Sequence, residues 1–126
     1  MIETILLEGQ TIQEPGLLTL KLDRQIEVNV PADEAQRKAN YFIHMEISTQ
    51  MHAEMPLLVI GKGDTAVWRV PIHLTFPALG DVGCAGYLLV DPTTGQIDRS
   101  PAAIVELTAN AEKLALRFTS PAAHTI

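Results

Sequence analysis

The sequence predicts an α+β domain in which an antiparallel sheet of about five strands carries two helices packed on one face. Apolar and polar residues alternate over 66–76, and a second apolar run over 84–90 ends in the turn sequence Asp-Pro-Thr-Thr-Gly. Two other stretches, 31–51 and 101–118, carry apolar residues at helical spacing. A chain of 126 residues can bury one core, so we expect a single domain over 1–126.

The N-terminal part is expected to form strands. Residues 3–8 read as a short strand, which the breakers at Gly9 and 14–16 leave weakly specified, so that 1–16 is expected to be mobile or exchanged between molecules. Residues 17–30 alternate on both sides of Asp23 and Arg24. This pattern fits two half-buried strands joined by a tight turn, and it fits one long bent strand equally well.

The first helix is expected to begin near Asp33, which with Gln36 matches a capping box, and to run to about Met51. Its apolar side collects Ala35, Ala39, Phe42, Ile43 and Ile47. Glu46 falls close to this stripe. A buried carboxylate there would be a candidate general acid or base, whereas one at the rim of the helix would be solvated or paired with a basic side chain.

Two strands are expected next, a short one over 57–60 and the long one over 66–76. The inner face of the long strand would carry Trp68, Val70, Ile72, Leu74 and Phe76. Arg69 and His73 would lie on the other face. Because Pro71 cannot donate to a strand ladder, this strand should have an edge or a bulge there, next to Arg69 and His73, where a partner strand could add.

The C-terminal part is expected to hold a loop over 76–83, a central strand over 84–90 and a second helix. Ser100 is the expected N-cap of that helix, with Pro101 at its first position. The apolar stripe comprises Ile104, Leu107, Ala111, Leu114, Ala115 and Phe118. This helix should cover Trp68, Ile72 and Leu74, and residues 119–126 should form a tail.

The charge, the cysteine count and the length of the apolar runs exclude several classes of protein. The net charge is −6, and residues 1–34 alone carry −5, so no basic stripe for direct nucleic-acid binding is expected. An acidic face there could contact a basic partner protein or be a solvated surface. The single cysteine excludes an internal disulfide, and no apolar run reaches membrane-spanning length. With no export signal at its start, the protein is expected in the cytoplasm.

Two His-x-Glu patterns, His44 with Glu46 and His52 with Glu54, use residue types that bind zinc or iron. Residues two apart on one continuous helix do not converge, so we expect no metal site and no cofactor. Cys84 could be paired with His73 or His44 as nucleophile and base, but no local signature activates the thiol. A buried structural cysteine and no catalytic residue are therefore expected.

The segments Trp68–Phe76 and Tyr87–Ile97, after an N-terminal helix, resemble the strand pair of PepSY-type domains. The longer combination of E-A-Q-R-K-A-N at 34–40, V-W-R-V-P-I at 67–72, V-D-P-T-T-G-Q-I at 90–97 and the Ser-Pro helix resembles a family of uncharacterised small bacterial proteins from cyanobacteria and Chloroflexi. That family brings no assigned activity. The PepSY resemblance implies inhibitory or peptide-contacting behaviour, although those domains are commonly exported.

The leading hypothesis is a non-catalytic protein-interaction or regulatory module that uses an edge strand or the acidic N-terminal segment with Glu8 and Glu14. The alternative is a small ligand-binding domain or enzyme with a pocket between helix and sheet, lined by Glu46, His44, His73 or Cys84. A third hypothesis is an antitoxin-like regulator. The candidate pocket or interaction residues are Glu46, His44, Arg69 and His73. Exposed strand edges favour a homodimer or another protein partner.

Overall fold

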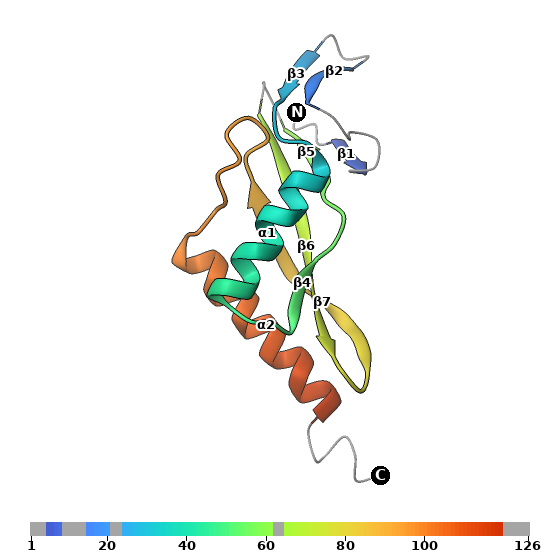
Figure 1. Cartoon of the computed structure of the whole chain (residues 1–126), viewed down its shortest axis with the longest axis vertical. Helices are drawn as coiled ribbons and strands as arrows, with labels where there is room; N and C mark the ends of the chain where they lie inside the picture. The colour runs from blue at the N-terminus through green and yellow to red at the C-terminus, as the bar shows by residue number, and fades with distance from the viewer. Residues whose placement is uncertain (1–4, 9–14, 21–23, 62–64, 120–126) are drawn as a thin grey trace.

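The computed structural model describes residues 5–8, 15–20, 24–61 and 65–119. Their α+β fold, with an antiparallel sheet and two helices, confirms the predicted class (Figure 1). The strands before the first helix are β1 (Ile5–Glu8), β2 (Gly16–Leu20) and β3 (Arg24–Val28), and the helix itself is α1 (Ala32–Glu46). After it come β4 (Met51–Ala53), β5 (Leu57–Ile60), β6 (Ala66–Phe76), β7 (Gly80–Val90) and α2 (Pro101–Thr119).

The long strand β6 organises the main sheet. β7 pairs with β6, and β5 and β4 pair with successive parts of it, toward its start and its end respectively. β1 pairs antiparallel with β5, so this N-terminal strand is part of the sheet of its own chain. β2 and β3 form a separate two-stranded antiparallel sheet, which decides the question of one strand or two over 17–30 in favour of two.

The sheet is irregular at Pro71, as the missing amide hydrogen requires. Ala53 pairs with Ile72 and Leu57 pairs with Arg69, so the residues 54–56 face only 70–71 on β6. The amide of Glu54 donates to the carbonyl of Pro71 at 2.8 Å. The pairing register with β6 therefore shifts by one residue between β4 and β5. The shift falls at Pro71, where β6 offers a carbonyl acceptor but no amide donor.

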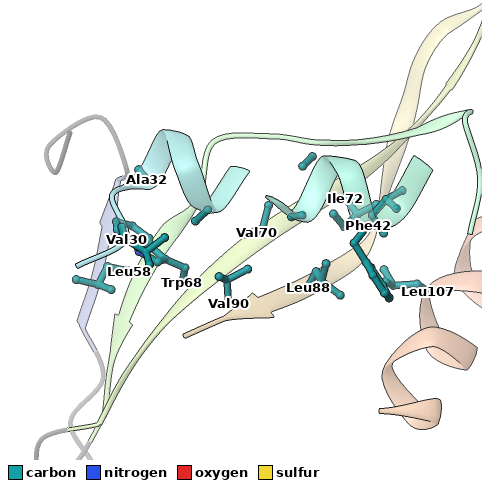
Figure 2. Packing of buried hydrophobic residues seen from close by; sticks show 14 of the residues in the cluster. Val30, Ala32, Phe42, Leu58, Trp68, Val70, Ile72, Leu88, Val90 and Leu107 are labelled. Carbon is teal, nitrogen blue, oxygen red and sulfur yellow. The ribbon is translucent and has the colours of Figure 1, made fainter. Parts of the chain in front are cut away.

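The core lies between one face of the sheet and the two helices. Alternate residues of β6 are buried from Trp68 to Leu74, and Leu88 and Val90 of β7 lie on the same face. Figure 2 shows Trp68 close to Val30, Leu58 and Ala32, near the start of α1, whereas Leu107 of α2 lies beside Leu88 and Phe42.

The expectation that α2 covers Trp68 is therefore wrong. The indole Nε1 of Trp68 donates to the carbonyl oxygen of Val30 at 2.7 Å, so the segment that enters α1 covers this side chain. β6 has 11 residues and is about 36 Å long, more than the 15-residue α1 can span at about 1.5 Å per residue. The two helices share the face, with α2 packed mainly on β7.

The first helix differs from its predicted form at both ends. Its N-cap is Pro31, which has no side-chain acceptor, so the predicted capping box of Asp33 and Gln36 does not form; Gln36 donates to the carbonyl of Ala53 at 3.1 Å. α1 stops at Glu46, and the chain turns back to form β4. The edge of β6 explains this early stop, since pairing Met51 with Leu74 buries Met51 and satisfies backbone groups that a longer helix would leave open.

The predicted loop over 76–83 is shorter than expected, because β7 already begins at Gly80. Gly80 and Gly83 have φ values of 75° and 135°, and β7 shifts register twice against β6. The expected central position of this strand is also wrong. Among the described strands β7 pairs only with β6, and its Tyr87 and Leu89 are 42% and 37% exposed.

The second helix begins as predicted. The amide of Ala103 donates to the Ser100 hydroxyl at 3.3 Å, and Pro101 is the first helical residue. The predicted stripe from Ile104 to Ala115 packs against the core, with Leu107 fully buried. The side chain of Phe118 and the tail from 120 onward lie outside the described part of the chain. Neither described helix is long and apolar enough to cross a membrane.

Candidate functional site

The face of the sheet opposite the helices carries a cluster of histidines and carboxylates. Because side chains alternate along a strand, His52 and Glu54 at the β4 edge project to the same side, together with His73 and Thr75 of β6. Asp81 of β7 pairs with Thr75 across the next ladder. Three neighbouring strands thus bring these five side chains together.

The contacts within this cluster are short. The ring Nδ1 of His73 lies 2.7 Å from Oδ2 of Asp81, and Nδ1 of His52 lies 3.0 Å from the Thr75 hydroxyl. Nε2 of His52 is 3.6 Å from a carboxylate oxygen of Glu54. The two imidazole rings are 6.1 Å apart between centroids. We call His52, Glu54, His73, Thr75 and Asp81 the open-face cluster.

Asp81 is held from two directions. The amide of Gly83 donates to its Oδ1 at 2.9 Å, while His73 occupies its Oδ2. Burial by itself would raise the pKa of this carboxyl, but the Gly83 amide, the His73 hydrogen bond and the charges of His73 and His52 lower the pKa below its ordinary value. Asp81 is therefore a carboxylate at neutral pH.

Helix α1 fixes the position of β4, although it lies on the other side of the sheet. The amide of Ala53 donates to Oδ1 of Asn40 at 3.0 Å, and its carbonyl accepts from Gln36 at 3.1 Å. These side chains satisfy the outer backbone groups of β4, which has β6 as its only described strand neighbour. His52 and Glu54 flank Ala53, so this anchoring also sets their place.

A second feature is a groove between α1 and residues 91–99, which run beside the helix (Figure 1). It encloses about 1040 Å³ and is lined by Glu34, Arg37, Lys38, Tyr41, Phe42, Met45, Glu46, Thr94, Gly95, Gln96, Ile97 and Arg99. We call it the α1–loop groove.

The loop wall of this groove is preformed by its own turn. Oδ1 of Asp91 accepts from the amides of Thr93 and Thr94 at 2.7 and 3.1 Å, and the amide of Gly95 donates back to the Asp91 carbonyl. Gly95 has a φ of 79°, and a Cβ there would lie 3.1 Å from the Lys38 side chain. The positive φ favours glycine, and the absence of a Cβ leaves the Lys38 side chain undisturbed, so the Thr-Thr-Gly turn can pack close against α1.

On the helix wall, Tyr41 and Met45 lie one turn apart and are 69% and 65% exposed. The guanidinium of Arg99 sits 5.1 Å from the centre of the Phe42 ring. The groove thus combines exposed aromatic and thioether side chains with cations held at its rim.

The residues predicted as site candidates fall into two groups. His44 and Glu46 are exposed on α1, and Glu46 also lines the α1–loop groove. Arg69 and His73 lie on the open face, where the Arg69 guanidinium stacks 3.8 Å from the centre of the Tyr87 ring. The sheet separates the first group from the second, so Glu46 and His73 do not share a pocket.

Cys84 differs from the expectation of a buried residue. It is exposed and pairs with His73 in the β6–β7 register, and its thiol donates to the carbonyl of Gly86 at 3.3 Å. The register shift after Ile72 explains the exposure, because it turns Ala85 inward to a buried position. The acidic residue Glu14 and the side chain of Glu8 lie outside the described part of the chain.

Sequence reasoning missed the open-face cluster because it placed His52 on a helix. The signal was present in the period-two spacing of His52 and Glu54, which puts both on one face of a strand. Asp81 could not be added from sequence, since its proximity depends on the register of β7 with β6. Comparison of the chain with known protein families, curated proteins and solved structures found no match.

Proposed function

We propose that the protein is a non-catalytic interaction module that binds a segment of a partner protein in the α1–loop groove. The observation that carries this proposal is the grouping of Tyr41, Phe42, Met45 and Arg99 around one preformed groove. Aromatic residues, methionine and arginine are the types enriched at protein–protein interfaces and at their energetic hot spots. The peptide-contacting behaviour implied by the PepSY resemblance agrees with this role.

The charge of the groove defines the partner segment. Arg37, Lys38 and Arg99 line it, which gathers three of the nine Lys and Arg residues of a chain whose net charge is −6. The ion pair of Arg37 with Asp33 is 3.9 Å long and well exposed, so it contributes little to the stability of the fold. Arg37 is therefore able to pair with an acidic group of a partner instead. We infer a segment that carries acidic side chains next to apolar ones.

The chemistry of the lining favours binding over catalysis. The described residues that line the groove include no His, Cys or Ser, and Lys38, Tyr41 and Glu46, which could also transfer protons, are exposed to solvent. Its two carboxylates, Glu34 and Glu46, flank the cations and would select the orientation of an acidic segment by repulsion at either end. We further propose that this encounter takes place in the cytoplasm, which the exposed free thiol of Cys84 supports.

A random peptide library displayed on phage, selected against the purified full chain, tests the proposal. We expect enriched peptides that combine Asp or Glu with aromatic or aliphatic residues. A synthetic peptide of the consensus should bind Arg99→Glu at least about tenfold more weakly than the native chain. Arg117→Glu on α2 is the matched control, because it reverses an exposed cation away from the groove and should leave the affinity unchanged.

Two results would overturn the proposal. One is the absence of any enriched peptide, and the other is an equal loss of affinity in both charge-reversal variants, which would indicate only long-range attraction. Sedimentation analysis of the native chain and of Tyr41→Ala distinguishes a second copy of the chain from a separate partner. A dimer that Tyr41→Ala dissociates would assign the groove to self-association instead.

A further inference from the structure

We propose that His52, Glu54 and Asp81 of the open-face cluster form a binding site for one divalent transition-metal ion. This site lies on the face of the sheet opposite α1 and is independent of the α1–loop groove. Each of the three residues offers one ligand atom, and these atoms all lie within 4.8 Å of one another.

The geometry is close to that of a bound site. Ligand atoms about 2.1 Å from one ion are about 3.4 Å apart in tetrahedral coordination. His52 Nε2 and the Glu54 carboxylate, at 3.6 Å, already satisfy this spacing. The Glu54 side chain is 44% exposed, so a change of its rotamer can bring its carboxylate toward Asp81 without moving the backbone.

The surrounding hydrogen bonds orient the donors. When Nδ1–H of His52 donates to the Thr75 hydroxyl at 3.0 Å, its Nε2 carries the free lone pair that a metal needs. One carboxylate oxygen of Asp81 accepts a hydrogen bond from the His73 ring, and the other accepts one from the Gly83 amide. Each oxygen keeps a second lone pair for a metal ion. Metal ligands in proteins are commonly held by such outer hydrogen bonds.

The donor set indicates the class of ion. One imidazole nitrogen and two carboxylate oxygens suit zinc, manganese or ferrous iron, whereas calcium and magnesium prefer oxygen ligands alone in larger number. The charges of Glu54 and Asp81 balance those of a divalent ion beside a neutral His52. Three protein ligands leave a coordination position open to water or to another molecule.

The chain contains its own control for this proposal. His44 and Glu46 repeat the His-x-Glu spacing of His52 and Glu54, but on the helix α1. Residues two apart face different directions on a helix and the same direction on a strand. If the metal site depends on the geometry of the sheet, substitution of His52 or Glu54 should lower the affinity for the ion, whereas substitution of His44 or Glu46 should not.

Titration calorimetry of the full chain with Zn²⁺ tests the inference. We expect one ion per chain, and an affinity that falls by at least about tenfold in each of His52→Ala and Asp81→Asn. His44→Ala should retain the native affinity. Because His44 and Asp81 are exposed and His52 is half-buried, circular dichroism should show all three variants folded, and Zn²⁺ should raise the thermal midpoint of the native chain but not of Asp81→Asn.

The inference is overturned if the native chain binds no Zn²⁺. It is also overturned if His44→Ala weakens binding as much as His52→Ala, because the ion would then be held by scattered surface histidines. Substitution with Co²⁺ provides a second readout, because the visible absorption spectrum of the ion shows whether it has a low coordination number and protein ligands. A Co²⁺ spectrum like that of the hydrated ion would contradict the site even if calorimetry detected weak association.

Discussion

The packing of α2 on β7 depends on the absence of a side chain at Gly86, and a double-mutant cycle with Leu107 measures this dependence. Gly86 has a φ of 148°, and a Cβ placed there would lie 3.0 Å from Cδ2 of Leu107. Gly86→Ala therefore introduces both backbone strain and a steric conflict. Leu107→Ala removes the atom that causes the conflict while leaving the strain in place.

The expected magnitudes follow from burial. Leu107 is 1% exposed, so its truncation should lower the free energy of unfolding by about 3 kcal/mol. The positive φ of Gly86 should make an alanine cost about 1–3 kcal/mol, before the contact with Leu107 is counted. In the double variant the new methyl group occupies part of the space that Leu107 vacates. We expect the combined loss to be smaller than the sum of the single losses by about 1 kcal/mol.

Urea denaturation of the four proteins, followed by the fluorescence of Trp68, gives these free energies. Gly83 is the matched control. Its φ is 135°, and its Cβ would lie 3.3 Å from Leu114 rather than from Leu107. Gly83→Ala combined with Leu107→Ala should be additive to within about 0.5 kcal/mol.

An additive cycle for Gly86 and Leu107 would refute the reasoning, because it would mean that the leucine does not pack on the glycine. A coupling of equal size in the Gly83 control would also refute it, since the effect would then be a general loosening of α2. The two cycles together distinguish a specific contact from a diffuse one.

Three further outcomes are expected. Trp68→Phe should lower the free energy of unfolding by about 2 kcal/mol in urea denaturation, because the buried Val30 carbonyl loses the indole donor at 2.7 Å; an unchanged midpoint would contradict this contact. Asn40→Ala should cost about 1 kcal/mol and speed hydrogen exchange of the Ala53 amide, whereas Asn40→Asp keeps an acceptor and should protect it. The exposed Cys84 should react fully with a thiol reagent in the native state, and labelling only after unfolding would show it to be buried.

Elements with strong local signals were predicted well. The start of α2 depends on Ser100 and Pro101, which act within one turn of the chain. The turn from Asp91 to Gly95 closes through its own side chain and backbone. The full length of β6 follows from its alternating pattern, which Pro71 interrupts only in the pairing. None of these features needs a distant residue.

The end of α1 could not be predicted in the same way. Ile47 and Met51 continue the apolar spacing of the helix, so the local pattern favours a longer helix than the one formed. Pairing of Met51 with Leu74 and the hydrogen bonds from Asn40 and Gln36 to Ala53 decide the outcome. These contacts join residues far apart in the sequence, and they override a helical periodicity that is only locally favourable.

The position of β7 shows the same limit. The apolar residues of 84–90 suggest a strand buried on both faces, but α2 covers only one face of β7 and leaves Tyr87 and Leu89 exposed on the other. Tyr87 is shielded in part by the stacked Arg69 instead of by a second layer. Hydrophobicity identifies a strand, but it does not identify its neighbours.

The sequence by itself determined the α+β class, the long strand β6, the capped start of α2 and the turn that forms one wall of the α1–loop groove. Each depends on alternation, helical spacing or turn chemistry within a few residues. Only the tertiary structure decided that α1 ends before His52, that β7 has β6 as its one neighbour among the described strands, and that His52, Glu54 and Asp81 meet on one face. The physical reason is that strand register is set by backbone pairing between distant segments, and register determines which side chains become neighbours.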